Sequence, residues 1–343
     1  MTVKRYSLGD FRLHSGDCLP DAFLSYETHG ELNHDRSNVI VYPTWYAGNH
    51  EDIRPAIGPG RALDPERYFI VVPDMFGNGR SSSPSNTPAP YDRARFPVIS
   101  TYDNVRAQHQ LMTVGLGIEY IQLVVGFSMG AQQAFHWGAL YSDMLGAIAP
   151  ICGTAKTSPH NQLLLESLQR TLLVTMQDLR VPPEQGLRAF TAMFASWGFS
   201  PEFYRQQKHL NWMGWDCRSI DEFLDNWHGL FIPKNDANDL LCMLQTWQNS
   251  DLGQHANFKG DLAAALRAIT CRAIVMPGST DMYFPPEDNQ KEVPHMPQAE
   301  LRTIDSIFGH AAGGPGFSNQ ADDDFVDAAL RELLTDHHFS EAD

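Results

Sequence analysis

The 343 residues carry a formal net charge of −16, and 43% of them are hydrophobic. This hydrophobic share is that of a globular protein with a large core rather than of a disordered chain. The acidic balance argues against nucleic acid or an anionic membrane surface as a partner. No apolar run approaches the roughly 20 residues of a membrane-spanning helix, and the N-terminus lacks the apolar core of a signal peptide.

The five cysteines are scattered along the chain without Cys-x-x-Cys spacing. They are Cys18, Cys152, Cys217, Cys242 and Cys271. An odd, dispersed set argues against a disulfide framework or a zinc site and fits a reducing compartment. We therefore expect a soluble, cytoplasmic protein without a metal site.

Outside the middle of the chain, strand and helix patterns alternate. Residues 5–30 alternate apolar and polar side chains around Gly16-Asp17, which predicts an antiparallel hairpin. Apolar strands are predicted at 38–43, 68–73, 120–125, 145–151 and 273–277, and a further strand at 300–304. Helices are predicted at 101–115 with Thr101 as the N-cap, at 129–141 and at 322–334. This alternation predicts an α/β fold with a mostly parallel central sheet and helices on both faces.

The middle of the chain, residues 156–254, has a different pattern. Strand-like runs vanish, and helical patterns cover 161–176, 183–195, 201–207, 220–228 and 236–249. Five of the seven tryptophans fall here. They either line a lid over an active site or form the core of a helical insertion. Both interpretations predict an all-helical cap at 156–254, inserted into a core made of 1–155 and 255–343.

A Gly-x-Ser-x-Gly segment, Gly126 to Gly130, joins a predicted buried strand to a predicted helix. Strand, sharp turn and helix are the context of a nucleophile elbow. The turn forces the serine into a strained backbone conformation, and the two glycines avoid clashes around it. The N-terminus of the following helix favours negative charge that develops at the serine oxygen. Ser128 is therefore the candidate nucleophile.

A serine nucleophile needs a base to accept its proton and a carboxylate to orient that base. In elbow enzymes these follow the serine in the chain order acid, then histidine. Asp281 and His310 stand a few residues after predicted strands in that order. Asp305 and Asp251 are alternatives for the acid, but one lies in the approach to His310 and the other in the helical insert.

The tetrahedral intermediate of acyl transfer also needs two backbone N–H donors. The first is the amide of Met129, directly after the nucleophile. The second is expected from the loop after the 38–43 strand, where Trp45 is the first candidate and Tyr46 the alternative. Tyr46, Trp227 and Phe231 are also predicted to line the substrate pocket.

Several stretches occur in the order found in a known family. They are 24–33, 58–70, 96–105, the Ser-Met-Gly-Ala-Gln-Gln-Ala of 128–134, and 236–241. Through them the chain resembles the homoserine O-acetyltransferase family of the α/β-hydrolase superfamily. The resemblance implies the α/β-hydrolase fold with a helical cap, and a homodimer formed through that cap. It also implies Ser128 as nucleophile, Asp281 as acid, His310 as base and the Trp45 amide as an oxyanion donor.

The chain departs from that family where the family binds homoserine. The family's catalytic histidine is followed by an aspartate that holds the amino group, whereas His310 is followed by Ala311. The family's cap segment carries an arginine for the carboxylate, and residues 239–248 contain none. Each lost charged contact costs about 1.5–3 kcal/mol. The Gly/Ser-rich loop 74–83 lacks the Walker lysine of a phosphate site and resembles the Asp-x-x-Gly-x-Gly-x-Ser of ordinary esterases.

These residues predict a serine hydrolase that cleaves an ester or amide of a small acyl substrate through an acyl-enzyme, without a metal ion or cofactor. One alternative keeps the acyl-enzyme but passes the acyl group from a thioester such as acetyl-CoA to an alcohol other than homoserine. The other alternative is a catalytically silent binding protein on the same fold.

Overall fold

The computed structural model describes residues 2–177 and 182–335. Within these residues, eight strands form a single sheet in the order β1-β2-β4-β3-β5-β6-β7-β8. The strands are β1 (Thr2–Arg12), β2 (Cys18–His29), β3 (Val39–Val41), β4 (Phe69–Pro73), β5 (Ile121–Phe127), β6 (Leu145–Ile151), β7 (Arg272–Val275) and β8 (Ala299–Leu301). From β4 to β8 all neighbours run parallel, so the predicted mostly parallel sheet is confirmed.

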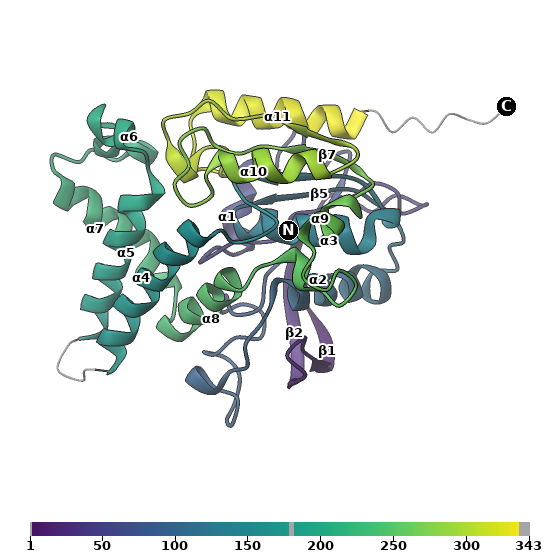
Figure 1. Cartoon of the computed structure of the whole chain (residues 1–343), viewed down its shortest axis with the longest axis horizontal. Helices are drawn as coiled ribbons and strands as arrows, with labels where there is room; N and C mark the ends of the chain where they lie inside the picture. Colours follow the sequence, from purple (N-terminus) through teal and green to yellow (C-terminus); the bar gives the residue numbers. More distant parts are fainter. Residues whose placement is uncertain (1, 178–181, 336–343) are drawn as a thin grey trace.

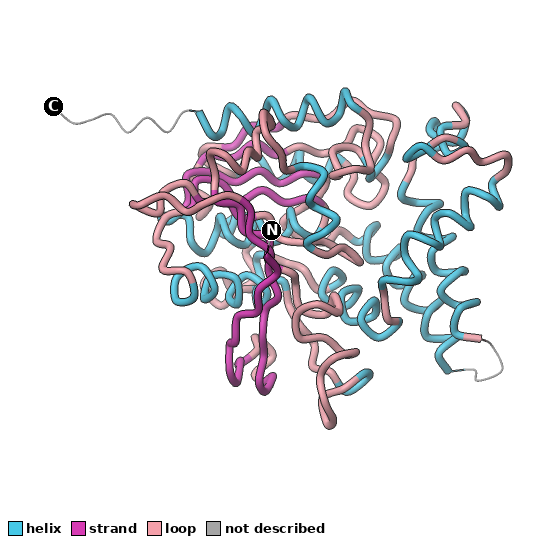
Figure 2. The backbone as a smooth tube through the Cα atoms, turned by 180° about the vertical axis from the view of Figure 1, so that it is seen from behind, coloured by secondary structure: helices cyan, strands magenta, loops and turns pink. Residues whose placement is uncertain are grey.

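The N-terminal strands form the antiparallel hairpin that the alternating pattern predicts. Lys4 lies opposite Tyr26 and Arg12 opposite Cys18, and β2 continues antiparallel onto β4. The far end of the hairpin extends beyond the sheet (Figure 2). The hairpin therefore adds two antiparallel strands to one edge of the parallel sheet.

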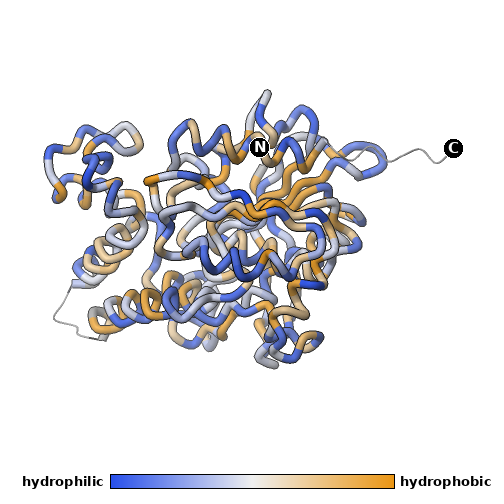
Figure 3. The backbone as a smooth tube through the Cα atoms, turned by 45° about the horizontal axis from the view of Figure 1, so that its top comes forward, coloured by the Kyte–Doolittle hydropathy of each residue, from blue (hydrophilic) through white to orange (hydrophobic). Residues whose placement is uncertain are grey.

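The helices are α1 (His50–Ile53), α2 (Thr101–Gln110), α3 (Met129–Tyr141), α4 (Pro159–Gln177), α5 (Pro183–Gly198), α6 (Pro201–Arg205), α7 (Ile220–Phe231), α8 (Ala237–Gln248), α9 (Leu262–Arg267), α10 (Pro286–Glu292) and α11 (Gln320–Thr335). Because side chains alternate along a strand, β3 sends Ile40 to the core under α11, and Val39 and Val41 to the core under α2, α3 and α9. Hydrophobic residues are concentrated along the strands in the middle of the molecule (Figure 3). Both faces of the sheet are thus covered, as predicted.

Helices α4 to α8 come between β6 and β7, and α4 to α7 lie to one side of the sheet (Figure 1). They fall within the range 156–254 predicted for the cap. Residues 178–181 of that range, and 1 and 336–343 of the predicted core, lie outside the described residues. The division into core and cap stays a prediction. No helix in the described ranges is both long and apolar enough to cross a membrane.

Several predicted boundaries are wrong, among them the start of α2 and the end of the last strand. The N-cap of α2 is Ser100 rather than Thr101, because Ser100 and Asp103 form a reciprocal capping box. The last strand ends at Leu301 instead of residue 304. Beyond it, Ile304 keeps only an isolated bridge to Gly278.

Candidate active site

The turn between β5 and α3 has the geometry of a nucleophile elbow. Ser128 adopts φ 57° and ψ −123°, a conformation that L-residues rarely occupy. A Cβ on Gly126 would lie 2.1 Å from the carbonyl oxygen of Gly130, and a Cβ on Gly130 would lie 2.7 Å from that of Pro43. Both positions therefore exclude any side chain, which explains the glycines on either side of the serine.

The three side chains predicted as nucleophile, base and acid form one hydrogen-bonded row. Ser128 Oγ lies 2.9 Å from His310 Nε2, and His310 Nδ1 lies 2.8 Å from Asp281 Oδ2. The other oxygen, Oδ1, accepts the backbone N–H groups of Tyr283 at 2.8 Å and Phe284 at 3.1 Å. Since an ionised carboxylate only accepts, the imidazole proton belongs on Nδ1. Nε2 is then free to accept the serine proton.

This row lies at the carboxyl ends of parallel strands, where open α/β sheets bind their ligands. Asp281 follows β7 and His310 follows β8, and Ser128, Asp281 and His310 are all buried. The alternative acids lie elsewhere: Asp305 faces the Ser279 hydroxyl, and Asp251 pairs with a lysine. Of the three candidate carboxylates, Asp281 is the one hydrogen-bonded to His310.

The amides predicted as oxyanion donors have no acceptor within the described part of the protein. Met129 is the first residue of α3, so its N–H points out of the helix N-terminus. Within the described residues, neither the Met129 amide nor the Trp45 amide donates to another protein group, and the same holds for the alternative, Tyr46. These N–H groups are available to an oxygen of a substrate.

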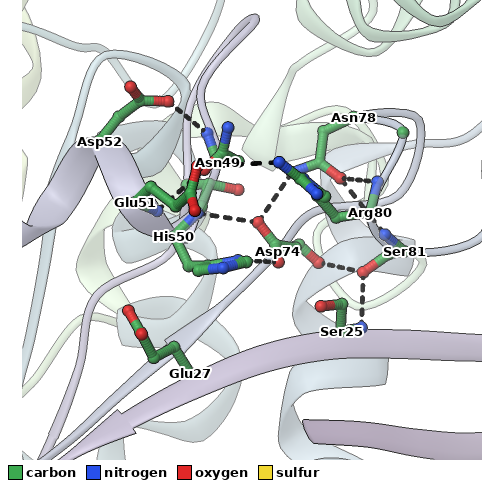
Figure 4. Close-up of polar contacts among 12 residues, drawn as sticks. Ser25, Glu27, Asn49, His50, Glu51, Asp52, Asp74, Asn78, Arg80 and Ser81 are labelled. Atoms are coloured by element: carbon green, nitrogen blue, oxygen red, sulfur yellow. Dashed lines mark hydrogen bonds and ion pairs between the residues drawn. The ribbon is translucent and has the colours of Figure 1, made fainter. Parts of the chain in front are cut away.

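A buried polar network holds the loop that carries Trp45 against the neighbouring loop after β4 (Figure 4). The Asp74 carboxylate accepts from the Nδ1 of His50 at 2.6 Å, from the His50 amide at 3.0 Å and from Asn78 Nδ2 at 3.0 Å. Ser81 Oγ donates to the Asp74 carbonyl at 2.7 Å and accepts from the Ser25 amide. Burial acts to lower the pKa of His50, but the hydrogen bond and charge of Asp74 outweigh it and raise this pKa.

A cavity of about 70 Å³ opens onto Ser128. Its wall consists of Trp45, Tyr46, Phe127, Ser128, Phe194, Gly198, Phe199, Trp212, Trp227, Phe231, Tyr283, His310, Ala311 and Phe317. All three predicted pocket residues, Tyr46, Trp227 and Phe231, lie on this wall. The tryptophans of the helical insert have different positions. Trp212 and Trp227 line the cavity, whereas Trp247 is fully buried in the core and does not line it.

Segment 236–241, which resembles a substrate-binding segment, lies away from this cavity. Asp236 caps α8, and the Asp239 carboxylate accepts from the amide and hydroxyl of Ser85. Burial raises the pKa of Asp239 to about 6 against the opposing effect of these bonds. Asp239 therefore ties α8 to the loop after β4. Across residues 2–177 and 182–335, no His, Cys, Asp or Glu side chains gather in threes to hold a metal ion.

Sequence patterns did not identify two groups that support the site, His50 with Asp74 and the buried Gln133. Asp74 does have a signal, because it directly follows a buried strand at the active edge of the sheet. The sequence signal for Gln133 is weaker: it is a polar residue within the mostly apolar helix that follows the elbow, and the structure shows that its side chain is only 1% exposed.

Comparison with known proteins agrees with this geometry. A model of the alpha/beta hydrolase fold matches residues 39–310. The ethyl acetate hydrolase of Pseudomonas veronii is 38% identical over 336 residues, which cover 96% of this chain and 94% of that protein. The structure of an acetylester hydrolase from Corynebacterium glutamicum is 36% identical and superposes with a TM-score of 0.90, covering 97% of this chain and 96% of that chain.

The resemblance to acetyltransferases is also confirmed. The homoserine O-acetyltransferase of Trichormus variabilis is 29% identical over 321 residues, covering 88% of this chain and 87% of that protein. The family model spans well over half of the chain, and the esterases align with nearly all of it. The chain belongs to the family with the alpha/beta hydrolase fold.

Proposed function

We propose that this protein is a serine hydrolase that cleaves small, uncharged carboxylic esters. The observation that carries the proposal is the hydrogen-bonded row of Ser128, His310 and Asp281, whose first two members line a small aromatic cavity. The identities to an ethyl acetate hydrolase and an acetylester hydrolase support esters over amides. The cavity size supports short acyl and alcohol groups.

In the proposed mechanism Ser128 attacks the ester carbonyl while His310 accepts its proton at Nε2. Asp281 keeps the proton of His310 on Nδ1 and stabilises the imidazolium that forms. The amides of Met129 and Trp45 donate to the oxyanion. His310 then protonates the leaving alcohol, and a water molecule activated by the same nitrogen releases the acid. No metal ion or cofactor takes part.

The composition of the cavity supports water, rather than homoserine, as the acceptor. Among the described residues that line it, no side chain is acidic or basic except His310, and Ala311 is buried. A zwitterion would lose its hydration there without gaining a charged partner, which costs several kcal/mol. The identity to a homoserine O-acetyltransferase supports a second candidate, acyl transfer to a neutral alcohol.

Labelling and turnover test the proposal together. The wild type should hydrolyse p-nitrophenyl acetate and ethyl acetate and react with a fluorophosphonate probe, and Ser128→Ala should lose both. Ser250→Ala is a matched control, because Ser250 is equally buried but lies outside the cavity. A wild type that neither reacts nor turns over would favour the silent binding protein. CoA release from acetyl-CoA that rises only when an alcohol is added would contradict hydrolysis as the main reaction.

We also propose that two copies associate through the helices of residues 156–254. Support comes from Leu163 and Val174 on α4, which are 64% and 65% exposed. They are three turns apart and so share one face of the helix. Light scattering should give twice the chain mass, and combining Leu163→Glu with Val174→Glu should give the single-chain mass. A wild type of single-chain mass would contradict the dimer.

A cytoplasmic location is proposed as well. It is supported by the five cysteines, all of which are free thiols. Fractionation of the native host should recover the protein with cytoplasmic markers, and recovery with an extracytoplasmic fraction would contradict this location.

A further inference from the structure

The side chain of Gln133 connects the elbow helix to the loop that carries Trp45. Gln133 lies one turn after Met129 in α3, and its Nε2 donates to the Thr44 carbonyl at 2.8 Å. The same nitrogen donates to the Met129 carbonyl at 3.2 Å. Gln133 and Thr44 are almost fully buried, at 1% and 0% exposure. Water therefore does not compete for these bonds.

Two further buried side chains fix the orientation of this amide. Gln133 Oε1 accepts from Gln108 Nε2 at 2.6 Å, and Gln108 Oε1 accepts from the indole N–H of Trp137 at 2.9 Å. An indole nitrogen can only donate. Gln108 must therefore turn its oxygen toward Trp137 and its nitrogen toward Gln133. This in turn directs the nitrogen of Gln133 to Thr44, so the donor direction is set along the whole row.

We infer that the row of Trp137, Gln108 and Gln133 positions the oxyanion donor of the proposed hydrolase. The Thr44 carbonyl and the Trp45 N–H belong to one peptide unit, and this peptide bond is trans. A trans peptide directs its N–H opposite to its carbonyl. Because Gln133 holds the carbonyl toward α3, the N–H is directed away from that contact. Trp45 lines the same cavity as Ser128, and its N–H has no acceptor among the residues that the structure describes.

Two further observations describe the surroundings of this peptide unit. A Cβ on Gly130 would lie 3.6 Å from the Thr44 carbonyl oxygen, which places that oxygen against the start of α3. The Thr44 hydroxyl accepts the amide of Met75 at 2.9 Å. Donors that are fixed before the reaction stabilise an oxyanion most effectively, because they need not reorganise when charge develops. Gln133 is thus a positioning residue that acts through the Trp45 amide.

Gln133→Met and Gln133→Glu remove the donor to Thr44 with little change of side-chain volume. Loss of a single oxyanion donor lowers kcat by about 10²–10³-fold, and misalignment should cost less. We expect kcat for a p-nitrophenyl ester to fall by about 10–100-fold and KM to change by less than about threefold. Gln132→Met is the matched control, because Gln132 is equally buried but its Nε2 donates to Thr157.

Inhibitor binding distinguishes positioning from general loss of structure. A trifluoromethyl ketone forms an oxyanion on the serine, whereas the corresponding secondary alcohol occupies the cavity without one. In the Gln133 variants the inhibition constant of the ketone should rise by the same factor by which kcat falls, and that of the alcohol should stay constant. Gln108→Met leaves Thr44 untouched but removes the partner of both Gln133 and the Trp137 indole, and it should show the same pattern at about 3–10-fold.

The inference rests on the proposed hydrolase, and the two can fail separately. A wild type without esterase activity or labelling contradicts the proposed function. An active wild type whose Gln133 variants keep kcat, or lose affinity for ketone and alcohol alike, contradicts the positioning role alone. An equal loss of kcat in Gln132→Met would also overturn it.

Discussion

The two walls of the cavity around Ser128 differ in kind. The wall formed by the sheet and its loops, called the polar wall here, holds the hydrogen-bonding groups of the site: His310 lines the cavity beside Ser128 and bonds to Asp281, and Gln133 and the Asp74 network lie behind the loops. The opposite wall, from α5 and α7 of the helical insert, presents aromatic rings such as Phe194 and Trp227. The core thus supplies directional contacts, whereas the insert supplies an apolar surface of a given size.

Because of this difference, we expect the polar wall to determine the rate of ester cleavage and the aromatic wall to determine which ester is preferred. Hydrogen bonds depend steeply on distance and angle, so substitutions in the polar wall should lower turnover for every ester. Apolar contacts depend on the area that is buried, so substitutions in the aromatic wall should change which ester is preferred. Variants in each wall, and one at the junction between the sheet region and the helical insert, test this separation.

Asp281→Asn should have the largest effect on turnover. The new oxygen can keep accepting from the amides of Tyr283 and Phe284, which turns the new NH₂ toward His310. The imidazole would then carry its proton on Nε2 and could not accept from Ser128. We expect kcat to fall by about 10⁴-fold, measured with a p-nitrophenyl ester.

Thermal unfolding is the control for this variant. The midpoint should move by only a few degrees, since the fold keeps the same hydrogen bonds to the loop after β7. Asp305→Asn, at the rival carboxylate, should retain near wild-type turnover. Retained activity in Asp281→Asn would contradict the assignment of the acid.

Ala311→Asp introduces a negative charge at a position that lines the cavity beside His310. A carboxylate there loses its hydration without a cationic partner in the cavity, so kcat/KM for ethyl acetate should fall by about 10–100-fold. Homoserine should still not be acetylated from acetyl-CoA, because residues 239–248 offer no arginine for its carboxylate. Ala311→Asn separates side-chain size from charge. Homoserine transfer by the single aspartate variant would show that the missing arginine matters less than we propose.

The polar wall was partly predictable from the sequence because its key residues occupy fixed places in the chain. Ser128 lies in a local motif, and His310 and Asp281 follow strands in a set order, so one-dimensional patterns suffice to bring them together. Its supporting contacts did not follow from patterns. Gln133 bonds to a carbonyl 89 positions earlier, and a backbone acceptor leaves no trace in residue identity.

The aromatic wall was predictable only in outline. Helical periodicity and the gathering of tryptophans predicted a helical insert, and Trp227 and Phe231, two of the residues predicted to line the substrate pocket, lie on the cavity wall. The assignment of each ring to the cavity or to the core depends on packing between helices. Trp212 and Trp247 are both buried, yet of the two only Trp212 lines the cavity.

Phe231→Ala should change which ester is preferred without impairing the cleavage step itself. Removing a ring from the cavity wall makes room for a longer acyl or alcohol group, and one or two methylenes in such a pocket are worth about 1–3 kcal/mol. We expect the ratio of kcat/KM for butyrate over acetate esters to rise by about 3–10-fold. Phe223→Ala, a buried ring of α7 that does not line the cavity, should lower stability without changing the ratio. An equal shift in both variants would contradict the assigned wall.

Glu292→Gln tests the junction between the sheet region and the helical insert, away from the cavity, and should have the smallest effect on turnover. Glu292, in α10, accepts the amides of Ala155 and Lys156, where the chain enters the helical insert. Burial raises the pKa of Glu292 to about 8, although these bonds and Asn289 act to lower it. Because an unfolded glutamate titrates near 4.3, the native state holds an extra proton between these two values.

This extra proton makes stability fall as pH rises. The contribution is fully present below the unfolded pKa and is lost as pH rises through the folded pKa of about 8. The wild type should therefore lose unfolding free energy, on the order of a few kcal/mol, between about pH 4.5 and pH 8. Glu292→Gln cannot ionise, so its unfolding midpoint should decline less over this range, while kcat stays within about twofold. Glu287→Gln, at an exposed position of the same helix, should follow the wild-type curve. Parallel curves for wild type and Glu292→Gln would mean that Glu292 is ionised in the folded protein, so that the junction holds a buried charge.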